Sequence, residues 1–384
     1  MNAIVKHMDS IAMKGWFEHM HRHPELSMHE KHTAEYIAEQ LRAIGGYEIA
    51  TGIGKHGIVA TLKVGDGDKV IGLRADFDAL PIQEENNLPY KSTVQGVAHL
   101  CGHDGHTAML LGAAKHLAET RNFNGTVRLI FQPAEETMEG GPAMINDGLF
   151  ERFPVDAVFG MHNIPGLEKG KFYFHAGEMM SAVDNWEVEI IGKGGHGGIP
   201  ELTIDPVVAG SSIVMAIQSI VSRNVAPSHR AVVTIGAFLA GNAGNVVAGS
   251  AILRFSIRST TPEDREMILT NIRRIVSHQA ESFGCTSEIR EGIPGAVLIN
   301  DAEETDKAAR IAQAAFGEDQ VVNPGPSFLA SEDFAFMLQK KKGTYCFLGN
   351  GPGKMVHHPE YVLDEEIMPI GAAYWVALTE GYLR

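Results

Sequence analysis

Strand-like apolar runs alternate with helical patterns through the first half of the chain, and this alternation is typical of an α/β sheet. The runs cover residues 57–63, 69–75, 126–131 and 155–160. A helical pattern at 105–119 lies between the second run and the third. An earlier helix is predicted to begin at a capping box formed by Ser27 and Glu30. It is predicted to end at Gly45-Gly46. Its apolar face comprises Ala34, Ile37, Ala38, Leu41 and Ile44.

The pattern changes at about residue 184 and returns to the first type after Pro294. In between, the predicted elements follow the order βαββαβ, at 186–194, 205–223, 230–238, 250–258, 262–283 and 285–291. The second helix has a clear start, because Thr261 can cap it and Pro262 suits its first position. This order is typical of a ferredoxin-like unit. We therefore predict that residues 184–294 are inserted into a catalytic domain made of 1–183 and 295–384.

Composition limits the classes of protein and partner. With 384 residues, 44% hydrophobic and 21% charged, the chain is too long for one core and too apolar for disorder, so two domains are expected. A net charge of −15 disfavours nucleic acid or an anionic membrane as partner. No stretch approaches the ~20 apolar residues of a membrane span, and the N-terminal segment lacks the uninterrupted apolar core of a signal peptide. These features predict a soluble, cytoplasmic protein.

The three cysteines are an odd number without a framework spacing, which argues against disulfides and for a reducing compartment. Cys285 and Cys346 are expected to be structural. Cys101 differs, because His103 follows it by two residues.

Polar residues of three chemical types follow separate apolar runs. Cys101, His103 and His106 belong to one segment, Glu135 and Glu136 to a second, and His162 to a third. A soft thiolate, imidazoles and paired carboxylates are ligands that transition metals accept together. Because open α/β sheets place their sites just after strands, these segments predict a metal site.

Eight segments in chain order resemble the family of hippurate hydrolases and N-acyl-amino-acid amidohydrolases. They are RADFDALP (74–81), HLCGHDGHTAML (99–110), QPAEE (132–136), GMHN (160–163), GKGGHGGIPE (192–201), GNAGNVV (241–247), SEDF (331–334) and HHPEY (357–361). The family is one of two-metal peptidases that also include aminoacylases, acetylornithine deacetylase and plant auxin-conjugate hydrolases. Phe77 is a small departure, since Met is expected there in many relatives.

The resemblance implies a fold and a metal pair. The fold is a mixed-sheet, two-metal exopeptidase-like catalytic domain with an inserted ferredoxin-like domain that serves as lid or dimerisation domain. The implied ligands of two divalent ions are Cys101, His103, Glu136, His162 and His357. The family pattern His-x-Pro selects His357, although the sequence alone leaves the adjacent His358 open. Zinc, manganese, cobalt or nickel would suit this mixed set.

The resemblance also implies roles for other residues of the first domain. Glu135 is the implied general base, beside the ligand Glu136. Asp76 and Asp78, at the end of a strand, are placed to orient ligating imidazoles, or are ordinary turn or capping residues. Asp104 can be explained by the dipole of the helix that it begins.

In the inserted domain, the resemblance implies that His196 stabilises the oxyanion in the active site of a partner subunit, within a homodimer or homotetramer. Asn245 and Arg258 are candidates for binding the α-carboxylate of the substrate. A turn asparagine and an arginine on an exposed strand are equally good interpretations. The histidines crowded near the N-terminus are interpreted as fold or surface residues: His19, His21, His23, His29 and His32.

The sequence thus predicts a metal-dependent hydrolase that splits N-acyl-L-amino acids into a carboxylic acid and a free amino acid. A dipeptidase or small-peptide carboxypeptidase is a second hypothesis, because the scissile amide and the α-carboxylate are alike. A non-catalytic metal-binding sensor is a third, although a sensor does not need a base such as Glu135. The acyl group and the metal stay open at this point.

Overall fold

The computed structural model describes residues 3–384, and the chain divides into two compact units. Unit 1 comprises Met1–Met179, Ile299–Ser327 and Asp333–Arg384. Unit 2 comprises Met180–Leu298 together with the short segment Phe328–Glu332. The chain therefore enters unit 2 after Met179 and returns to unit 1 at Ile299.

Within the described residues, unit 1 is built on an eight-stranded sheet with the order β1-β2-β4-β3-β5-β16-β6-β15. Its strands are β1 (Glu48–Ile53), β2 (Gly57–Val64), β3 (Val70–Asp76), β4 (Gly125–Gln132), β5 (Ala157–Pro165), β6 (Phe172–Tyr173), β15 (Val321–Val322) and β16 (Lys342–Gly351). The central strands β4, β3, β5 and β16 are parallel, whereas β2 joins β4 and β6 joins β16 in antiparallel pairs. The predicted α/β class with a mixed sheet is confirmed.

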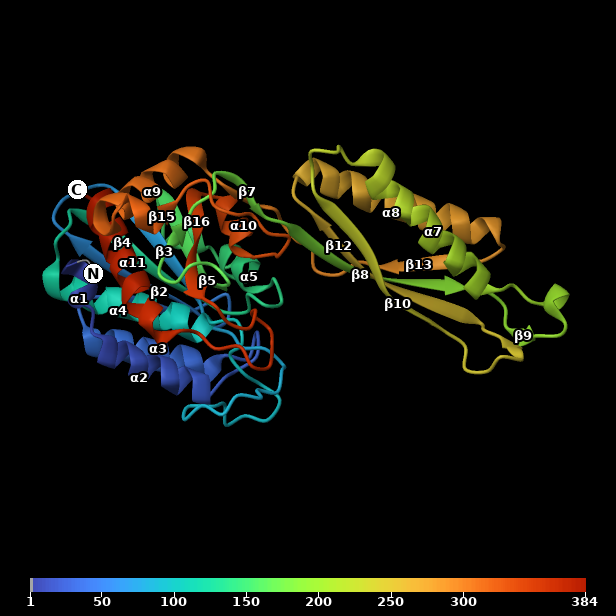
Figure 1. The fold of residues 1–384 in the computed structure, drawn as a ribbon, viewed down its shortest axis with the longest axis horizontal. Helices are drawn as coiled ribbons and strands as arrows, with labels where there is room; N and C mark the ends of the chain where they lie inside the picture. The colour runs from blue at the N-terminus through green and yellow to red at the C-terminus, as the bar shows by residue number, and fades with distance from the viewer. Residues whose placement is uncertain (1–2) are drawn as a thin grey trace. The chain divides into compact units, whose positions relative to one another are not determined.

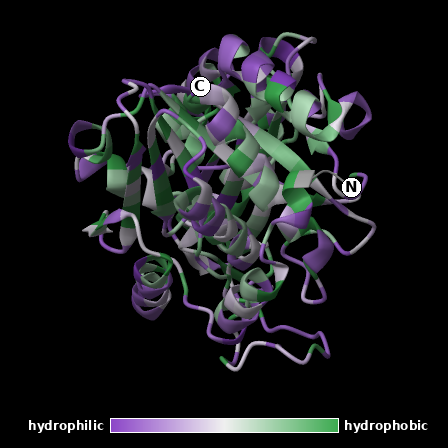
Figure 2. Ribbon diagram, turned by 90° about the vertical axis from the view of Figure 1, so that its left-hand side faces the viewer, coloured by the Kyte–Doolittle hydropathy of each residue, from purple (hydrophilic) through white to green (hydrophobic). Residues whose placement is uncertain are grey.

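The helices of unit 1 pack around this sheet (Figure 1). They are α1 (Ala3–Lys6), α2 (Ser10–Arg22), α3 (Lys31–Ile44), α4 (His103–Thr120), α5 (Gly140–Asn146), α6 (Leu149–Arg152), α9 (Ala302–Phe316), α10 (Phe334–Leu338) and α11 (Met368–Tyr382). Helix α4 lies among α2, α3 and α11 and is almost wholly buried. Figure 2 shows hydrophobic residues along the inner strands and hydrophilic residues on outer helices and loops. Each large aliphatic side chain in this core contributes about 2 kcal/mol by leaving water.

The start of α3 differs from the sequence prediction. Glu30 is the N-cap residue, but its side chain makes no capping bond among the described residues. Its carboxylate accepts instead from the backbone N–H of Ala134 at 2.8 Å, and the Ser27 hydroxyl donates to Asp78 at 2.7 Å. The N–H of Thr33 is bound by Glu25. The predicted capping box is therefore wrong, because both of its side chains are used in long-range contacts.

Unit 2 contains, within the described residues, a four-stranded antiparallel sheet with the order β10-β12-β8-β13. The elements of unit 2 are β8 (Ala182–Ile191), β9 (Gly195–His196), η1 (Pro200–Leu202), α7 (Pro206–Asn224), β10 (Ala231–Ala240), β11 (Val246–Val247), β12 (Ser250–Ser259), α8 (Pro262–Ser282) and β13 (Thr286–Arg290). Helices α7 and α8 pack together on one face of the sheet (Figure 1). The predicted start of α8 is confirmed, because Thr261 accepts from the N–H of Asp264 and Pro262 is the first helical residue.

Helix α7 is, among the described helices, the one that is long and apolar enough to cross a membrane by length and composition. It has 19 residues and a mean hydropathy of 1.3 over its most apolar window, of which 33% is buried. The expectation that no stretch approaches the length of an apolar membrane span is therefore wrong for this helix. Ala209, Ile213, Ile217 and Ile220 pack into the core of unit 2, so α7 is a packed helix with additional exposed apolar residues.

Candidate metal centre

Three parallel strands bring distant residues to one edge of the sheet in unit 1. Asp76 ends β3, Glu135 and Glu136 follow β4, and His162 lies in the last part of β5. Strands β4, β3 and β5 are neighbours and run in the same direction. Their carboxyl ends therefore meet at the position where open α/β sheets carry their sites.

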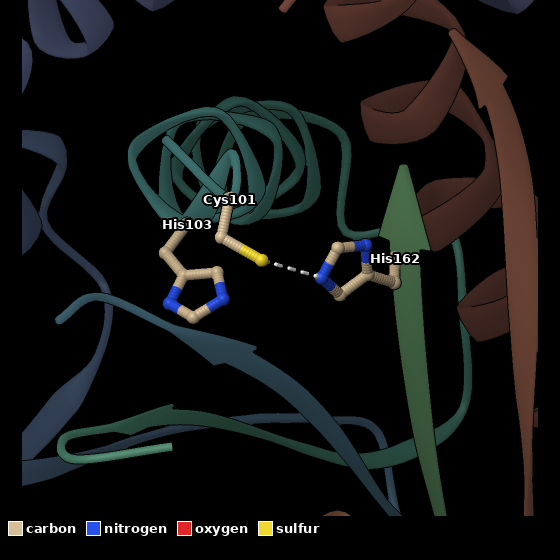
Figure 3. Close-up of side chains that lie close together, drawn as sticks. All are labelled: Cys101, His103 and His162. Atoms are coloured by element: carbon tan, nitrogen blue, oxygen red, sulfur yellow. Dashed lines mark hydrogen bonds between the residues drawn. The ribbon is translucent and has the colours of Figure 1, made fainter. Parts of the chain in front are cut away.

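The loop before α4 brings a thiol and a second imidazole to the same edge. Figure 3 shows Cys101, His103 and His162 close together, with the Cys101 sulfur directed toward the His162 ring. The distance from Cys101 Sγ to His162 Nε2 is 3.3 Å. Gly102, between Cys101 and His103, has a φ of 98°. A Cβ atom at this position would lie 2.2 Å from the side-chain oxygen of Asn163, so the turn requires glycine.

The remaining predicted ligands complete the cluster. His357 Nε2 lies 3.3 Å from Glu136 Oε2, and His103 Nε2 lies 3.8 Å from Glu136 Oε1. The ligand atoms of Cys101, His103 and His162 all lie within 4.8 Å of one another, as do those of Cys101, Glu136 and His357. Together these two groups contain the five predicted ligands, and Cys101 belongs to both.

The two adjacent histidines after β16 have different surroundings. The backbone N–H of His357 donates to the carbonyl of Leu100 at 2.7 Å, which ties this segment to the residue before Cys101. The ring of His358 makes a local hydrogen bond instead, in which its Nδ1 accepts from the N–H of Glu360 at 3.0 Å. The structure thus brings His357, and not His358, to the cluster.

The imidazoles direct their Nε2 atoms into the cluster. His103 Nδ1 donates to Asp78 at 3.0 Å, and His162 Nδ1 donates to the backbone oxygen of Asn163 at 2.6 Å. Both rings therefore direct Nε2 toward the other ligands. His103 Nε2 and Glu136 Oε1 are buried and have no hydrogen-bond partner among the described residues. Buried polar atoms without partners are rare, so this pair is suited to bind a cation.

The charges of the cluster lead to the same conclusion. Burial, together with the carboxylates of Glu136 and Glu135, raises the pKa of the Cys101 thiol well above its usual range. Burial lowers the pKa of His103, but Asp76 and Asp78 raise it to about 10. A site with this excess of negative charge favours cations, and a divalent metal would hold Cys101 as thiolate. The residues present therefore fit divalent metal ions.

Asp78 holds two of the predicted ligands by hydrogen bonds, whereas Asp76 holds His106, which lies beside them. The Asp78 carboxylate accepts from His103 Nδ1 and, through its other oxygen, from the N–H of Glu136 at 3.0 Å. Asp76 accepts from His106 Nδ1 at 2.7 Å and from Arg74 Nη1 at 2.7 Å. Such bonds fix the orientation and the tautomer of ligating imidazoles.

Two supporting residues had no role assigned from the sequence: His106, which was named only as part of the predicted metal-site segment, and Arg74. His106 lies between Asp76 and the side-chain oxygen of Asn163, which is 2.7 Å from its Nε2. The spacing of His103 and His106, three residues apart on one helix, was the available signal. Arg74 also bonds Gln132 at 2.9 Å and Asp333 at 3.1 Å, but a buried arginine in a strand has no local signature.

Glu135 is 7% exposed, and its Oε2 lies 3.8 Å from His103 Nε2. The preceding Ala134 has a φ of 51°, and its N–H is held by Glu30. This backbone turn directs two consecutive carboxylates to the same cluster. Glu135 is thus beside the candidate ligands without belonging to the five.

The other predicted residues lie in unit 2. His196 is exposed on β9, and its Nδ1 accepts from the N–H of Gly198 at 3.0 Å, so the neutral ring carries its proton on Nε2. Asn245 is adjacent, because its carbonyl accepts from the N–H of Gly197 at 2.8 Å. Arg258 Nη1 donates to the carbonyl of Leu329 at 2.6 Å.

Asn245 and Arg258 are not brought together within one chain. Asn245 precedes β12, whereas Arg258 is the next-to-last residue of this strand of 10 residues. A strand of this length spans about 30 Å. The two side chains of a single chain therefore cannot bind the same carboxylate.

Comparisons with known proteins agree with a dinuclear site. Residues 72–381 match Peptidase family M20/M25/M40. The chain is 44% identical to hippurate hydrolase of Campylobacter jejuni, with 100% of both chains covered. It is 37% identical to N-acetylcysteine deacetylase of Bacillus subtilis, over 94% of this chain and 93% of the relative. A solved dinuclear metal binding peptidase of the M20 family from Bacillus subtilis is 34% identical, with a TM-score of 0.82 and coverage of 97% and 98%.

Proposed function

Because the chain belongs to peptidase family M20/M25/M40, we propose that it is a metal-dependent amidohydrolase of N-acyl-L-amino acids, which it splits into a carboxylic acid and a free amino acid. The observation that carries the proposal is the position of Glu135 beside five converging ligand atoms. A site that only bound metal would have no use for this additional carboxylate.

The residues assigned to hold two divalent ions are Cys101, His103, Glu136, His162 and His357. Bound there, such ions supply Lewis acidity, which polarises the amide carbonyl and makes water a stronger acid. Zinc, manganese, cobalt and nickel all accept this combination of sulfur, nitrogen and oxygen ligands. Asp76 and Asp78 keep the imidazoles of His106 and His103 oriented.

Glu135 is assigned the proton transfers. Its carboxylate takes a proton from the attacking water and passes it to the amide nitrogen as the C–N bond breaks. Burial on the sheet edge keeps this carboxylate away from bulk water. The turn at Ala134, fixed by Glu30, holds the Glu135 backbone in place.

A panel of substrates tests the proposal. Purified protein is incubated with N-benzoylglycine, N-acetyl-amino acids and dipeptides, and the released amino acid is quantified. Faster cleavage of the N-acyl compounds supports the amidohydrolase. Faster cleavage of dipeptides would instead identify a dipeptidase or small-peptide carboxypeptidase, and metal binding without any cleavage would favour a sensor.

We infer that unit 2 is a ferredoxin-like lid and dimerisation domain, and that its partner is a second copy of this chain. Strand β10 is an edge strand of the sheet, and edges of this kind readily pair with another chain. Apolar side chains are exposed on β10 and on the neighbouring α7, among them Leu239 and Val208, each 50% exposed, and Met215, 73% exposed. A two-fold interface would cover the same patch on both copies.

The dimer would also give His196 and Asn245 a role. His196 carries a donor Nε2–H on an exposed turn, with Asn245 beside it. We infer that both act in the partner's site, with His196 donating to the oxyanion. Asn245 and Arg258 of one chain would then serve different sites, which removes the conflict of the ~30 Å separation along one strand.

Replacing His196 with Ala is expected to lower kcat about 10²- to 10³-fold, the usual effect of losing one oxyanion donor. The decisive measurement mixes H196A with E135Q, after dissociation and reassociation. If His196 acts across the dimer, mixed dimers contain one intact site, and about a quarter of the wild-type activity returns with random pairing. Activity no higher than that of the separate variants would contradict the assignment.

A reducing location is consistent with the cysteines, and we infer that the protein is cytoplasmic. Cys101, Cys285 and Cys346 are all buried and free. The net charge of −15 is consistent with a small-molecule substrate rather than with nucleic acid or an anionic membrane.

A further inference from the structure

His21 is a buried polar residue that the proposed reaction does not use. It lies in the last turn of α2 and is 3% exposed. Its ring packs against Phe17, at a centroid distance of 5.6 Å, and against Tyr90, at 5.2 Å with perpendicular planes. The aromatic neighbours fix the ring plane, so its two nitrogens point in defined directions.

Both ring nitrogens of His21 meet carboxylates. Nδ1 lies 2.7 Å from Asp104 Oδ2, and Nε2 lies 3.3 Å from Glu84 Oε1. A neutral imidazole can donate through one nitrogen only, whereas the protonated ring donates through both. Burial lowers the pKa of His21, but the two carboxylates raise it to about 9. A positive ring therefore separates two buried negative groups.

The first carboxylate leads directly to the candidate metal ligands. Asp104 follows His103 in the chain, and its other oxygen accepts from the N–H of Gly105 at 2.9 Å. One side chain thus joins the first turn of α4 to α2. A displacement of Asp104 would move His103, and with it the loop that carries Cys101.

The second carboxylate leads to the segment of His357. Glu84 Oε2 accepts from the N–H of Ser92 at 2.8 Å, which closes the loop that contains both residues. The next residue, Glu85, donates its N–H to the carbonyl of Pro359 at 2.9 Å. Asn86 donates its side-chain N–H to the carbonyl of Tyr361 at 2.8 Å. This loop is therefore bonded to two residues of the chain segment that follows His357.

We propose that His21 is a positioning residue, which links the Cys101–His103 turn to the His357 segment so that ligand atoms from separate parts of the chain converge. This inference rests on the proposed metal centre. The alternative is a purely structural role, in which His21 stabilises the fold without setting the ligand geometry. The two differ in the metal affinity of correctly folded protein.

The test compares wild type with H21Q, E84Q and the control H23Q. His23 is on the same part of the chain but exposed, and its ring bonds only the carbonyl of His19 among the described residues. Each metal-free protein is checked for folding by circular dichroism and titrated with Co²⁺ by calorimetry. The visible spectrum of the cobalt form reports the geometry of the metal and its thiolate, independently of catalysis.

H21Q is expected to bind Co²⁺ about 10-fold more weakly, the low end of the effect of changing a direct outer partner of a metal ligand, because His21 acts through Asp104 and Glu84. Its cobalt–thiolate bands are expected to shift, and those of H23Q to match wild type. E84Q keeps the His21–Asp104 bond and should show a smaller change of the same kind. If H21Q does not fold, E84Q tests the positioning role of His21.

Unchanged affinity and spectrum in folded H21Q or, where H21Q does not fold, in E84Q would overturn the inference and leave His21 as a core residue. If wild type bound no cobalt, the proposed metal centre itself would fail. If wild type bound cobalt but hydrolysed no amide, only the proposed reaction would fail, and the comparison of H21Q with H23Q would still hold.

Discussion

Replacing Glu135 with Gln is expected to lower kcat for N-acyl amino acids about 10²- to 10⁴-fold, the range that general acid–base catalysis contributes. The amide has nearly the same shape as the carboxylate, but it cannot take a proton from water. Since Glu135 is not among the five assigned ligands, both metal ions should remain bound. Steady-state kinetics and elemental analysis of the same preparation measure the two quantities.

Glu139 provides the matched control for this substitution. It lies in the same loop, and its side chain makes no capping bond to α5 among the described residues. E139Q should therefore keep wild-type kcat. If E135Q retained full kcat, or if it lost activity only because it lost metal, Glu135 would not be the base.

Replacing Cys101 with Ala is expected to weaken the binding of both metal ions by more than ~100-fold, which is beyond the usual effect of an outer partner. The reason is that its sulfur belongs to both groups of candidate ligand atoms. The metal-free protein should still fold, because burial and the neighbouring carboxylates favour a neutral thiol there. Metal content by mass spectrometry and amide hydrolysis measure the loss.

Cys285 serves as the control for Cys101, because it is also buried but packs in the core of unit 2. C285A should keep both metal ions. A C101A protein with two tightly bound ions and wild-type turnover would remove Cys101 from the centre.

The sequence predicted the mixed α/β class and the family because those depend on local patterns. Strand periodicity identified β3, β4 and β5, and a general property of parallel strands placed their ends at one edge. The short polar segments at these ends then indicated which residues would come together in a metal site. The structure gathers the five predicted ligands there, with His357 rather than its neighbour.

The supporting residues could not be predicted, because their partners are distant in sequence. Ser27 and Glu30 are spaced as a local capping box, yet they bond Asp78 and Ala134. His21 was interpreted only as one of several fold or surface histidines, because nothing near it in sequence shows that Asp104 and Glu84 lie beside its ring. A local pattern gives the type of an element, whereas these contacts depend on how elements pack.

A metal titration of the chelated protein tests most directly whether hydrolysis depends on two metal ions. Zinc, manganese or cobalt is added in known ratios, and N-benzoylglycine hydrolysis and bound metal are measured on each sample. A two-metal amidohydrolase is expected to show no activity without metal and a plateau of activity when two ions are bound per chain. Full activity after complete removal of metal, or a plateau at one ion, would contradict a two-metal amidohydrolase.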